Sequence, residues 1–300
     1  MALYTERNGL RVPVEKTYQI TPDRYHLLLD VCKRHFDNIS WKYQERCPDG
    51  KGSCGIDLKH FRMVAKYRMP TLEFDERNNI ITPINFNTDA CFSIFDLIEF
   101  ICLNWKDISK REFHSFYKHY DITFSESNEQ IGRFKEEIND AFEKMGLLYT
   151  LTEKYNIERI VWNSSLIEEA QNSMEKIQEK GMQELLNEAI IAYKTPNPSA
   201  RQTSVEKIWD AFERLKTYYT FLSKKDSAEK IVNDMANNDA HFRELFDKEF
   251  KELTSIGNNY RIRHHETYKF EINETEHYDY LFNRCLSLIT TALCCVDKYT

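Results

Sequence analysis

The stretch CFSIFDLIEFICLNW, residues 91–105, decides the fold of the first half of the chain. Its apolar residues occupy nearly every face of a helix, and Glu99 breaks their longest uninterrupted run. A helix that is apolar all round is buried inside a domain. We therefore expect residues 91–105 to form the central helix around which the N-terminal half packs.

Helix signals continue on both sides of this stretch. Thr21-Pro22 predicts a helix start before RYHLLLDVCKRHF, and a short helix is expected from Asp57 to Met69. The spacing Ser127-x-x-Gln130 predicts a capping box for a further helix, which Gly146 ends. The apolar stripe of that helix comprises Ile131, Phe134, Ile138, Phe142 and Met145. The N-terminal half is therefore predicted to be helical.

The spacing of the apolar residues changes from helical to alternating at LLYTLTEKYNIERIVW, residues 147–162. This stretch is rich in β-branched and aromatic residues around Glu-Lys-Tyr-Asn. This pattern predicts a small β-hairpin. We expect it to mark a domain boundary. The predicted organisation is an N-terminal domain over 1–146, a hairpin connector over 147–163 and a C-terminal domain over 164–300.

The second half returns to helical spacing. Helices are expected over 164–178, 181–194, 239–254 and 276–297, and a further apolar stripe runs from Val205 to Tyr219. Short connections between amphipathic helices favour an antiparallel bundle. The fold class predicted for the whole chain is mainly α.

Composition narrows the class of protein. The 300 residues include only 8 Gly and 7 Pro, and the formal net charge is −7. The scarcity of glycine and proline, which interrupt helices, agrees with a helical fold. The negative net charge argues against a protein that binds nucleic acid over its whole surface. No signal peptide, membrane span, phosphate-binding glycine loop or cofactor motif is evident, so a cytoplasmic protein without cofactor or membrane partner is expected.

A compact group of basic residues lies in NNYRIRHHETYK, residues 258–269. Arg261, Arg263, His264 and His265 are all within five positions. Histidine titrates near neutrality and serves as a general acid or base, whereas arginine neutralises a phosphate with a planar fork of donors. This set suits metal-independent RNA cleavage through the 2′-hydroxyl.

A structural explanation of the same residues stays open. Arginine and histidine near a helix end also meet its unpaired carbonyls and the negative end of the helix dipole. Glu266 is placed to pair with Arg263 or Lys269. Residue types alone do not separate this explanation from catalysis.

The pattern of SVEKIWDAFERL, then a long helical segment, NYRIRHHE and an apolar last helix resembles HEPN domains of AbiJ-like abortive-infection proteins. In that group an Ile-Arg-His sequence precedes the last helix, as Ile262-Arg263-His264 does here. The first half is similar to AbiJ N-terminal domains of the fourth type. The motifs that carry that similarity are YTERNG, FDLIEFI and EEINDAFEKMGLLYTLTEKYNIERI.

The resemblance implies a dimeric ribonuclease of a prokaryotic phage-defence system, with a composite site across the last helices. HEPN ribonucleases separate their arginine and histidine by four to six residues, usually with a polar residue after the arginine. Here three residues separate Arg261 from His265, none separates Arg263 from His264, and Ile262 follows Arg261. The resemblance implies that Arg263 and His264 are the primary catalytic residues, and that Arg261 and His265 are the secondary ones.

The function predicted from the sequence is therefore a HEPN-type endoribonuclease that acts as a homodimer, with Asn259 and Lys269 contacting the RNA. The alternative is a non-catalytic HEPN scaffold whose N-terminal half senses a phage or cellular trigger. The prediction of a DNA-binding regulator has less support, because the net charge is negative and no pair of recognition helices is evident.

Two further groups of residues contain side chains that can bind a metal ion. Cys47 and Cys54 flank a turn-rich loop with His60 beyond, but their spacing exceeds that of paired zinc thiolates. His114 and His119 are five apart in REFHSFYKHY, which we interpret as a solvated aromatic-rich helix. No metal site is predicted.

Overall fold

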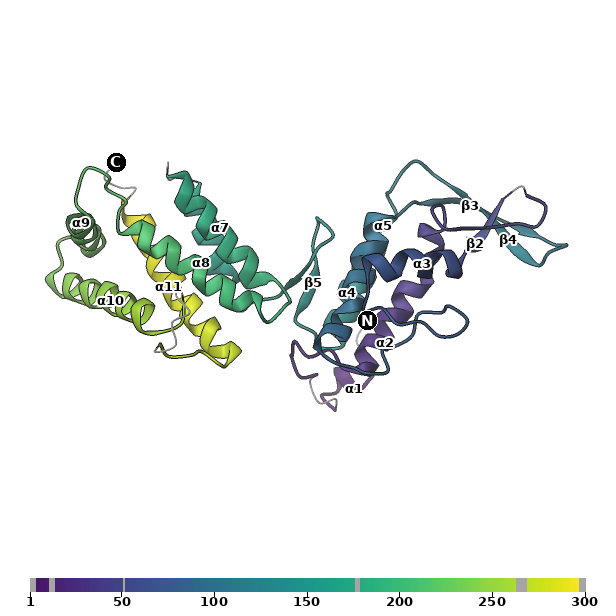
Figure 1. The fold of residues 1–300 in the computed structure, drawn as a ribbon, viewed down its shortest axis with the longest axis horizontal. Helices are drawn as coiled ribbons and strands as arrows, with labels where there is room; N and C mark the ends of the chain where they lie inside the picture. Colours follow the sequence, from purple (N-terminus) through teal and green to yellow (C-terminus); the bar gives the residue numbers. More distant parts are fainter. Residues whose placement is uncertain (1–3, 11–13, 51, 176–178, 263–268, 297–300) are drawn as a thin grey trace. The chain divides into compact units, whose positions relative to one another are not determined.

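The computed structural model of this chain describes residues 4–10, 14–50, 52–175, 179–262 and 269–296. The chain divides into two compact units, residues 1–159 and 160–300 (Figure 1). Each unit buries a hydrophobic core of its own.

Helix α4, Thr88–Leu103, is the centre of the first unit. The side chains of Ile94, Leu97, Ile98 and Ile101 on this helix have 0% exposure, which confirms the prediction of a buried central helix. The other helical elements of this unit are α1 (Tyr4–Arg7), α2 (Pro22–Arg34), the 3-10 helix η1 (Phe36–Ile39), α3 (Leu58–Arg68) and α5 (Ile131–Lys144).

The predicted starts of α2 and α3 are confirmed. The Thr21 hydroxyl accepts a hydrogen bond from the Arg24 amide at 3.4 Å, and the Asp57 carboxylate accepts one from the His60 amide at 3.0 Å. Such side-chain acceptors satisfy the first amides of a helix, which have no partner within it.

The capping box predicted for α5 is wrong, because a residue distant in the sequence replaces it. The amide of Gln130 donates to both carboxylate oxygens of Asp107, at 3.1 and 3.0 Å. The hydroxyl of Ser127 also points to Asp107, at 3.3 Å. Asp107 is only 1% exposed. Its carboxylate accepts hydrogen bonds from these donors and from the indole N–H of Trp105, at 2.7 Å.

The first unit also contains a four-stranded antiparallel sheet that the sequence analysis did not predict. Its strands are β1 (Gln44–Arg46), β2 (Ser53–Ile56), β3 (Ile108–His114) and β4 (His119–Phe124), in the order β1-β2-β4-β3. Strands β3 and β4 form a hairpin, so the helix proposed for His114 and His119 is wrong. Figure 1 shows these strands extending away from the helices of their unit.

A small β-hairpin forms the C-terminal end of the first unit. Strands β5 (Tyr149–Leu151) and β6 (Ile157–Arg159) pair antiparallel, within the region predicted to form a hairpin. Tyr149, Leu151 and Ile157 belong to the core of the first unit. Residues 147–163 are predicted as a connector, whereas this hairpin belongs to the first unit as far as Arg159.

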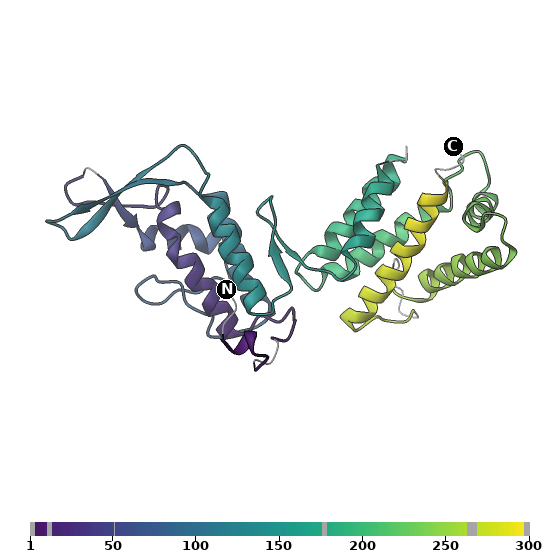
Figure 2. The same cartoon turned by 180° about the vertical axis from the view of Figure 1, so that it is seen from behind.

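The second unit consists of packed helices. They are α6 (Ser164–Met174), α7 (Lys180–Lys194), α8 (Ala200–Leu215), α9 (Lys224–Ala236), α10 (Ala240–Asn259) and α11 (Thr275–Val296). The view from behind in Figure 2 shows α7, α8 and α11 side by side, and α11 also contacts α6 and α9. The rings of Tyr193 and Phe282 stack at 3.9 Å in this core.

The helix predicted over residues 276–297 is confirmed as α11, and its buried side chains include Leu281, Phe282, Cys285, Ile289, Ala292 and Val296. No disulfide joins cysteines of the described residues. Over the described parts of the chain, no helix has both the length and the apolar character needed to cross a bilayer.

Candidate functional site

A groove of about 730 Å³ lies in the second unit where α10 ends and α11 begins. Three exposed aromatic side chains line it: Tyr260 is 37% exposed, Phe270 66% and Tyr280 61%. The remaining lining residues are Glu252, Ser255, Ile256, Asn259, Glu271, Ile272, His277, Leu281 and Arg284. The groove therefore combines flat aromatic surfaces with polar and charged groups.

Backbone pairing positions the chain at one edge of this groove. Tyr260 and Phe270 form an isolated parallel bridge, in which the Arg261 amide donates to the Phe270 carbonyl at 2.9 Å. The Phe270 amide donates to the Asn259 carbonyl at 2.9 Å. Ile262, next to Arg261, is only 1% exposed. These contacts fix both chain segments that flank the predicted basic cluster.

Of the predicted site residues, the structure describes Arg261, Asn259 and Lys269. The guanidinium of Arg261 pairs with the Glu271 carboxylate at 3.0 Å. The Asn259 side-chain amide donates to the Ser255 hydroxyl at 3.1 Å and lines the groove. Lys269 is half-buried and directly precedes Phe270. Arg263, His264 and His265 lie outside the described residues.

The charges within the described part of the groove are mixed. Arg284 donates two hydrogen bonds to the carboxylate of Glu249, at 2.8 and 3.0 Å. This hydrogen bonding raises the pKa of Arg284, so its charge is permanent. Glu252 and Glu271 also line the groove. The described lining therefore offers an anionic ligand no surplus of positive charge.

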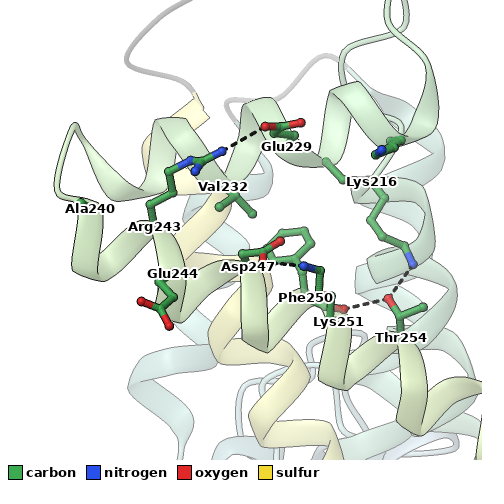
Figure 3. Close-up of a pocket in the computed structure, with 12 residues that line it drawn as sticks. Lys216, Glu229, Val232, Ala240, Arg243, Glu244, Asp247, Phe250, Lys251 and Thr254 are labelled. Carbon is green, nitrogen blue, oxygen red and sulfur yellow. Dashed lines mark hydrogen bonds and ion pairs between the residues drawn. The ribbon is translucent and has the colours of Figure 1, made fainter.

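A second hollow of the same unit, about 780 Å³, lies beside α9 and α10 (Figure 3). Two of its basic residues pair with carboxylates: Arg243 with Glu229 at 3.0 Å and Lys251 with Asp247 at 2.7 Å. Lys216 donates to the Thr254 hydroxyl at 3.0 Å. Because the lining carries both acidic and basic side chains, it has no clear preference for a charged ligand.

A third group of functional side chains gathers on the sheet of the first unit. His114 and His119 are register partners across the β3–β4 hairpin, and Asp121 lies two residues beyond His119. Opposite residues of a hairpin and residues two apart on one strand share a face of the sheet. One face of this hairpin therefore presents two imidazoles and a carboxylate together.

Cys47 joins this group from the first hairpin of the sheet. Its thiol sulfur lies 3.4 Å from Nδ1 of His114. The ligand atoms of Cys47, His114, His119 and Asp121 all lie within 4.8 Å of one another. Cys54 and His60, which the sequence analysis weighed with Cys47, are not part of this cluster.

A tight turn places Cys47 at that position. The Cys47 carbonyl accepts from the Gly50 amide at 2.8 Å, and the Cys47 amide donates to the Gly52 carbonyl at 2.9 Å. Pro48 occupies the second position of this turn, and Gly50 has φ +76°, a conformation that favours glycine. Burial raises the pKa of the Cys47 thiol above its usual 9.0, and the nearby Asp49 adds to the rise.

The sequence pattern does not predict this cluster, because the two histidines are interpreted as helical. The available signal was the run from Ile108 to Phe124, in which β-branched and aromatic residues flank HSFYKH. Such a composition is typical of a hairpin.

Comparisons of the whole chain with protein-family models, with curated proteins and with solved structures gave no match. The likeness to HEPN and AbiJ-type proteins therefore stays a prediction from short motifs.

Proposed function

We propose that the second unit is a HEPN-type endoribonuclease of a phage-defence system, which cleaves RNA without a metal ion. The observation that carries the proposal is the aromatic groove beside Arg261, directly before the sequence Arg263-His264-His265. The proposed active form is a homodimer that pairs two such sites through the second unit.

The groove suits a single-stranded nucleic acid. Exposed aromatic rings stack on bases of any sequence, and each such stacking contributes about 1–3 kcal/mol to binding. Tyr260, Phe270 and Tyr280 offer three rings within one groove, and the volume of about 730 Å³ is that of an ordinary ligand site. Asn259 adds an amide group able to contact a base or a phosphate.

The proposed reaction uses the basic cluster next to the groove. One of His264 and His265 takes the proton of a ribose 2′-hydroxyl, whose oxygen then attacks the phosphorus. The bond from phosphorus to the 5′-oxygen breaks, and the other histidine of the composite site protonates that leaving oxygen. Arg263 and Arg261 neutralise the phosphate. The products are a 2′,3′-cyclic phosphate and a 5′-hydroxyl.

A non-catalytic scaffold is the second candidate, and the ion pairs of the groove favour it. Arg261 is held by Glu271 and Arg284 by Glu249, so both described arginines are already paired with carboxylates. In this alternative the second unit only dimerises, and the first unit recognises a phage or cellular trigger.

An RNA cleavage assay separates these two functions. The purified full chain is incubated with total RNA and with transfer RNA in EDTA, and the RNA ends are analysed. A double variant, Arg263→Ala with His264→Ala, removes the primary predicted site. The matched control, His241→Ala with Arg243→Ala, removes the same residue types near the start of α10.

We expect the wild type and the control to leave 2′,3′-cyclic phosphate ends, and the Arg263/His264 variant to be inactive while remaining folded. An RNA with a single 2′-deoxy residue at the cleaved position should resist cleavage there. A folded wild-type dimer that leaves RNA intact would favour the scaffold. Cleavage that survives in the Arg263/His264 variant would move the active site elsewhere.

A further inference from the structure

We propose that Cys47, His114, His119 and Asp121 bind a zinc ion that joins the two hairpins of the sheet in the first unit. This site is separate from the proposed nuclease, whose residues all belong to the second unit. The donor set is a thiolate, two imidazoles and a carboxylate, which are the ligand types that zinc takes in proteins.

The distances between the ligand atoms fit a tetrahedral ion. Zinc bonds of about 2.0–2.1 Å to nitrogen or oxygen, and about 2.3 Å to sulfur, place tetrahedral ligand atoms about 3.3 Å apart, or about 3.6 Å when one is sulfur. Sγ of Cys47 lies 3.4 Å from Nδ1 of His114. Oδ2 of Asp121 lies 3.4 Å from Nδ1 of His114, and Oδ1 of the same carboxylate lies 3.2 Å from Nε2 of His119. The distances from Sγ of Cys47 and from Oδ2 of Asp121 to Nδ1 of His114 are close to such tetrahedral edges, and the four ligand atoms all lie within 4.8 Å of one another.

The charges of the cluster also balance those of a divalent ion. A Cys47 thiolate and the Asp121 carboxylate together supply two negative charges, and the neutral imidazoles of His114 and His119 add none. Binding therefore gives a neutral ligand set where Cys47 is almost fully buried, at 2% exposure, with the Asp49 carboxylate beside it at 3.9 Å from Nδ1 of His114. The side chains of His119 and Asp121 are 21% and 31% exposed, which leaves a path for the ion.

The geometry disfavours the other chemistry that cysteine, histidine and aspartate support. In a nucleophilic triad the thiol and the carboxylate contact opposite nitrogens of the imidazole. Here Sγ of Cys47 and Oδ2 of Asp121 both approach Nδ1 of His114, each at 3.4 Å. Donors that converge on one point are arranged for an ion placed between them.

The proposed ion has a structural role, because the protein supplies all four ligands. The loop after β1 provides Cys47, and the β3–β4 hairpin provides the other three ligands. The ladder that connects these hairpins, between β2 and β4, has a single register pair, Ser53 with Ile122. An ion bound by Cys47 and His119 would therefore link the two hairpins where the backbone pairing between β2 and β4 is shortest.

Metal content and cobalt spectroscopy test the site directly. The full chain, free of any affinity tag, is incubated with ZnCl₂, desalted and analysed for zinc, and apo protein is titrated with CoCl₂. We expect one ion per chain and the visible absorption of tetrahedral cobalt with a thiolate-to-cobalt band in the near ultraviolet. Cys47→Ser should abolish that band, and His119→Ala should lower the bound zinc at least tenfold.

Cys54→Ser and His60→Ala are the matched controls, since both residues are close in sequence but outside the cluster. Both should bind zinc like the wild type. Alkylation mapped by mass spectrometry tests the unmodified chain: a chelator should accelerate the labelling of Cys47 and leave that of Cys54 unchanged. Wild-type protein that retains no zinc, or Cys54→Ser that loses zinc as Cys47→Ser does, would overturn the proposal.

Discussion

At the scale of single residues, Gly257 allows α10 to approach α8 closely. The indole nitrogen of Trp209 donates to the Leu253 carbonyl on α10 at 3.1 Å. A Cβ atom added at Gly257 would lie 2.6 Å from that nitrogen, well inside van der Waals contact. The last turn of α10, which carries Asn259 of the groove, therefore depends on the absence of a side chain at position 257.

We predict that Gly257→Ala destabilises the protein. Overpacking against a buried ring costs about 1–3 kcal/mol, which exceeds the gain of about 1 kcal/mol from replacing glycine within a helix. Gly132→Ala on α5 is the control, because its added Cβ would meet no atom within 4 Å. It should leave stability unchanged or raise it. Urea unfolding of both variants measures the difference, and equal effects would refute the packing argument.

At the scale of elements, Glu179 joins the start of α7 to the end of α8. One of its carboxylate oxygens accepts from Nε and Nη2 of Arg214, at 3.0 and 2.6 Å. The other accepts from the Met182 amide at 2.6 Å, so Glu179 also caps α7. The hydrogen bonds from Arg214 are the main reason that the pKa of Glu179 falls below its usual 4.5.

This depressed pKa predicts how stability depends on pH. A carboxyl group whose pKa is lower in the folded state stabilises the fold above its unfolded pKa, and loses that contribution as pH falls through the folded pKa. Glu179→Gln should therefore lower the free energy of unfolding by about 1 kcal/mol at neutral pH. The difference from wild type should shrink once pH falls below 4.5, the usual pKa of this group, and vanish below its lowered folded pKa.

Denaturant unfolding across this pH range measures the effect, with Glu168→Gln on α6 as an exposed control. The control should follow the wild-type curve. A deficit of Glu179→Gln that persists unchanged into acid would show that the charge of Glu179 contributes nothing.

The elements that the sequence predicts are those whose pattern is local. Helices α4 and α5 were predicted because each places apolar residues on a face that reaches a core within one continuous run. Strand β3 lacks that signal, since every residue from Ser109 to Phe113 is exposed. A strand that buries neither face needs no alternation of apolar and polar residues. The sequence pattern therefore does not identify this hairpin, which is predicted to be a helix.

The cluster on the sheet was missed for a related reason. Cys47 and His114 are 67 positions apart and meet only through the order of the strands. Without that order, Cys54 and His60 were the natural partners for Cys47. The basic segment at 258–269 shows the opposite case, because its residues are adjacent in sequence and were found at once. Its chemistry stays a prediction, since Arg263, His264 and His265 fall outside the described residues.

At the scale of the whole molecule, two separate cores imply two cooperative units. Ile98 lies in the core of the first unit and Ile208 in that of the second, and both are 0% exposed. Truncating a buried isoleucine to valine costs about 0.5–1.5 kcal/mol, and the loss falls on the unit whose core loses the methyl group. The two substitutions are therefore matched probes of the two units.

We predict that calorimetry of the full chain resolves two unfolding transitions. Ile98→Val should lower the midpoint of one of them, and Ile208→Val that of the other, by about 2–4 °C for each kcal/mol lost. The physical reason is that contacts within each core break together, whereas no core residue is shared between the two. A single transition that both variants shift equally would mean that the two cores unfold as one.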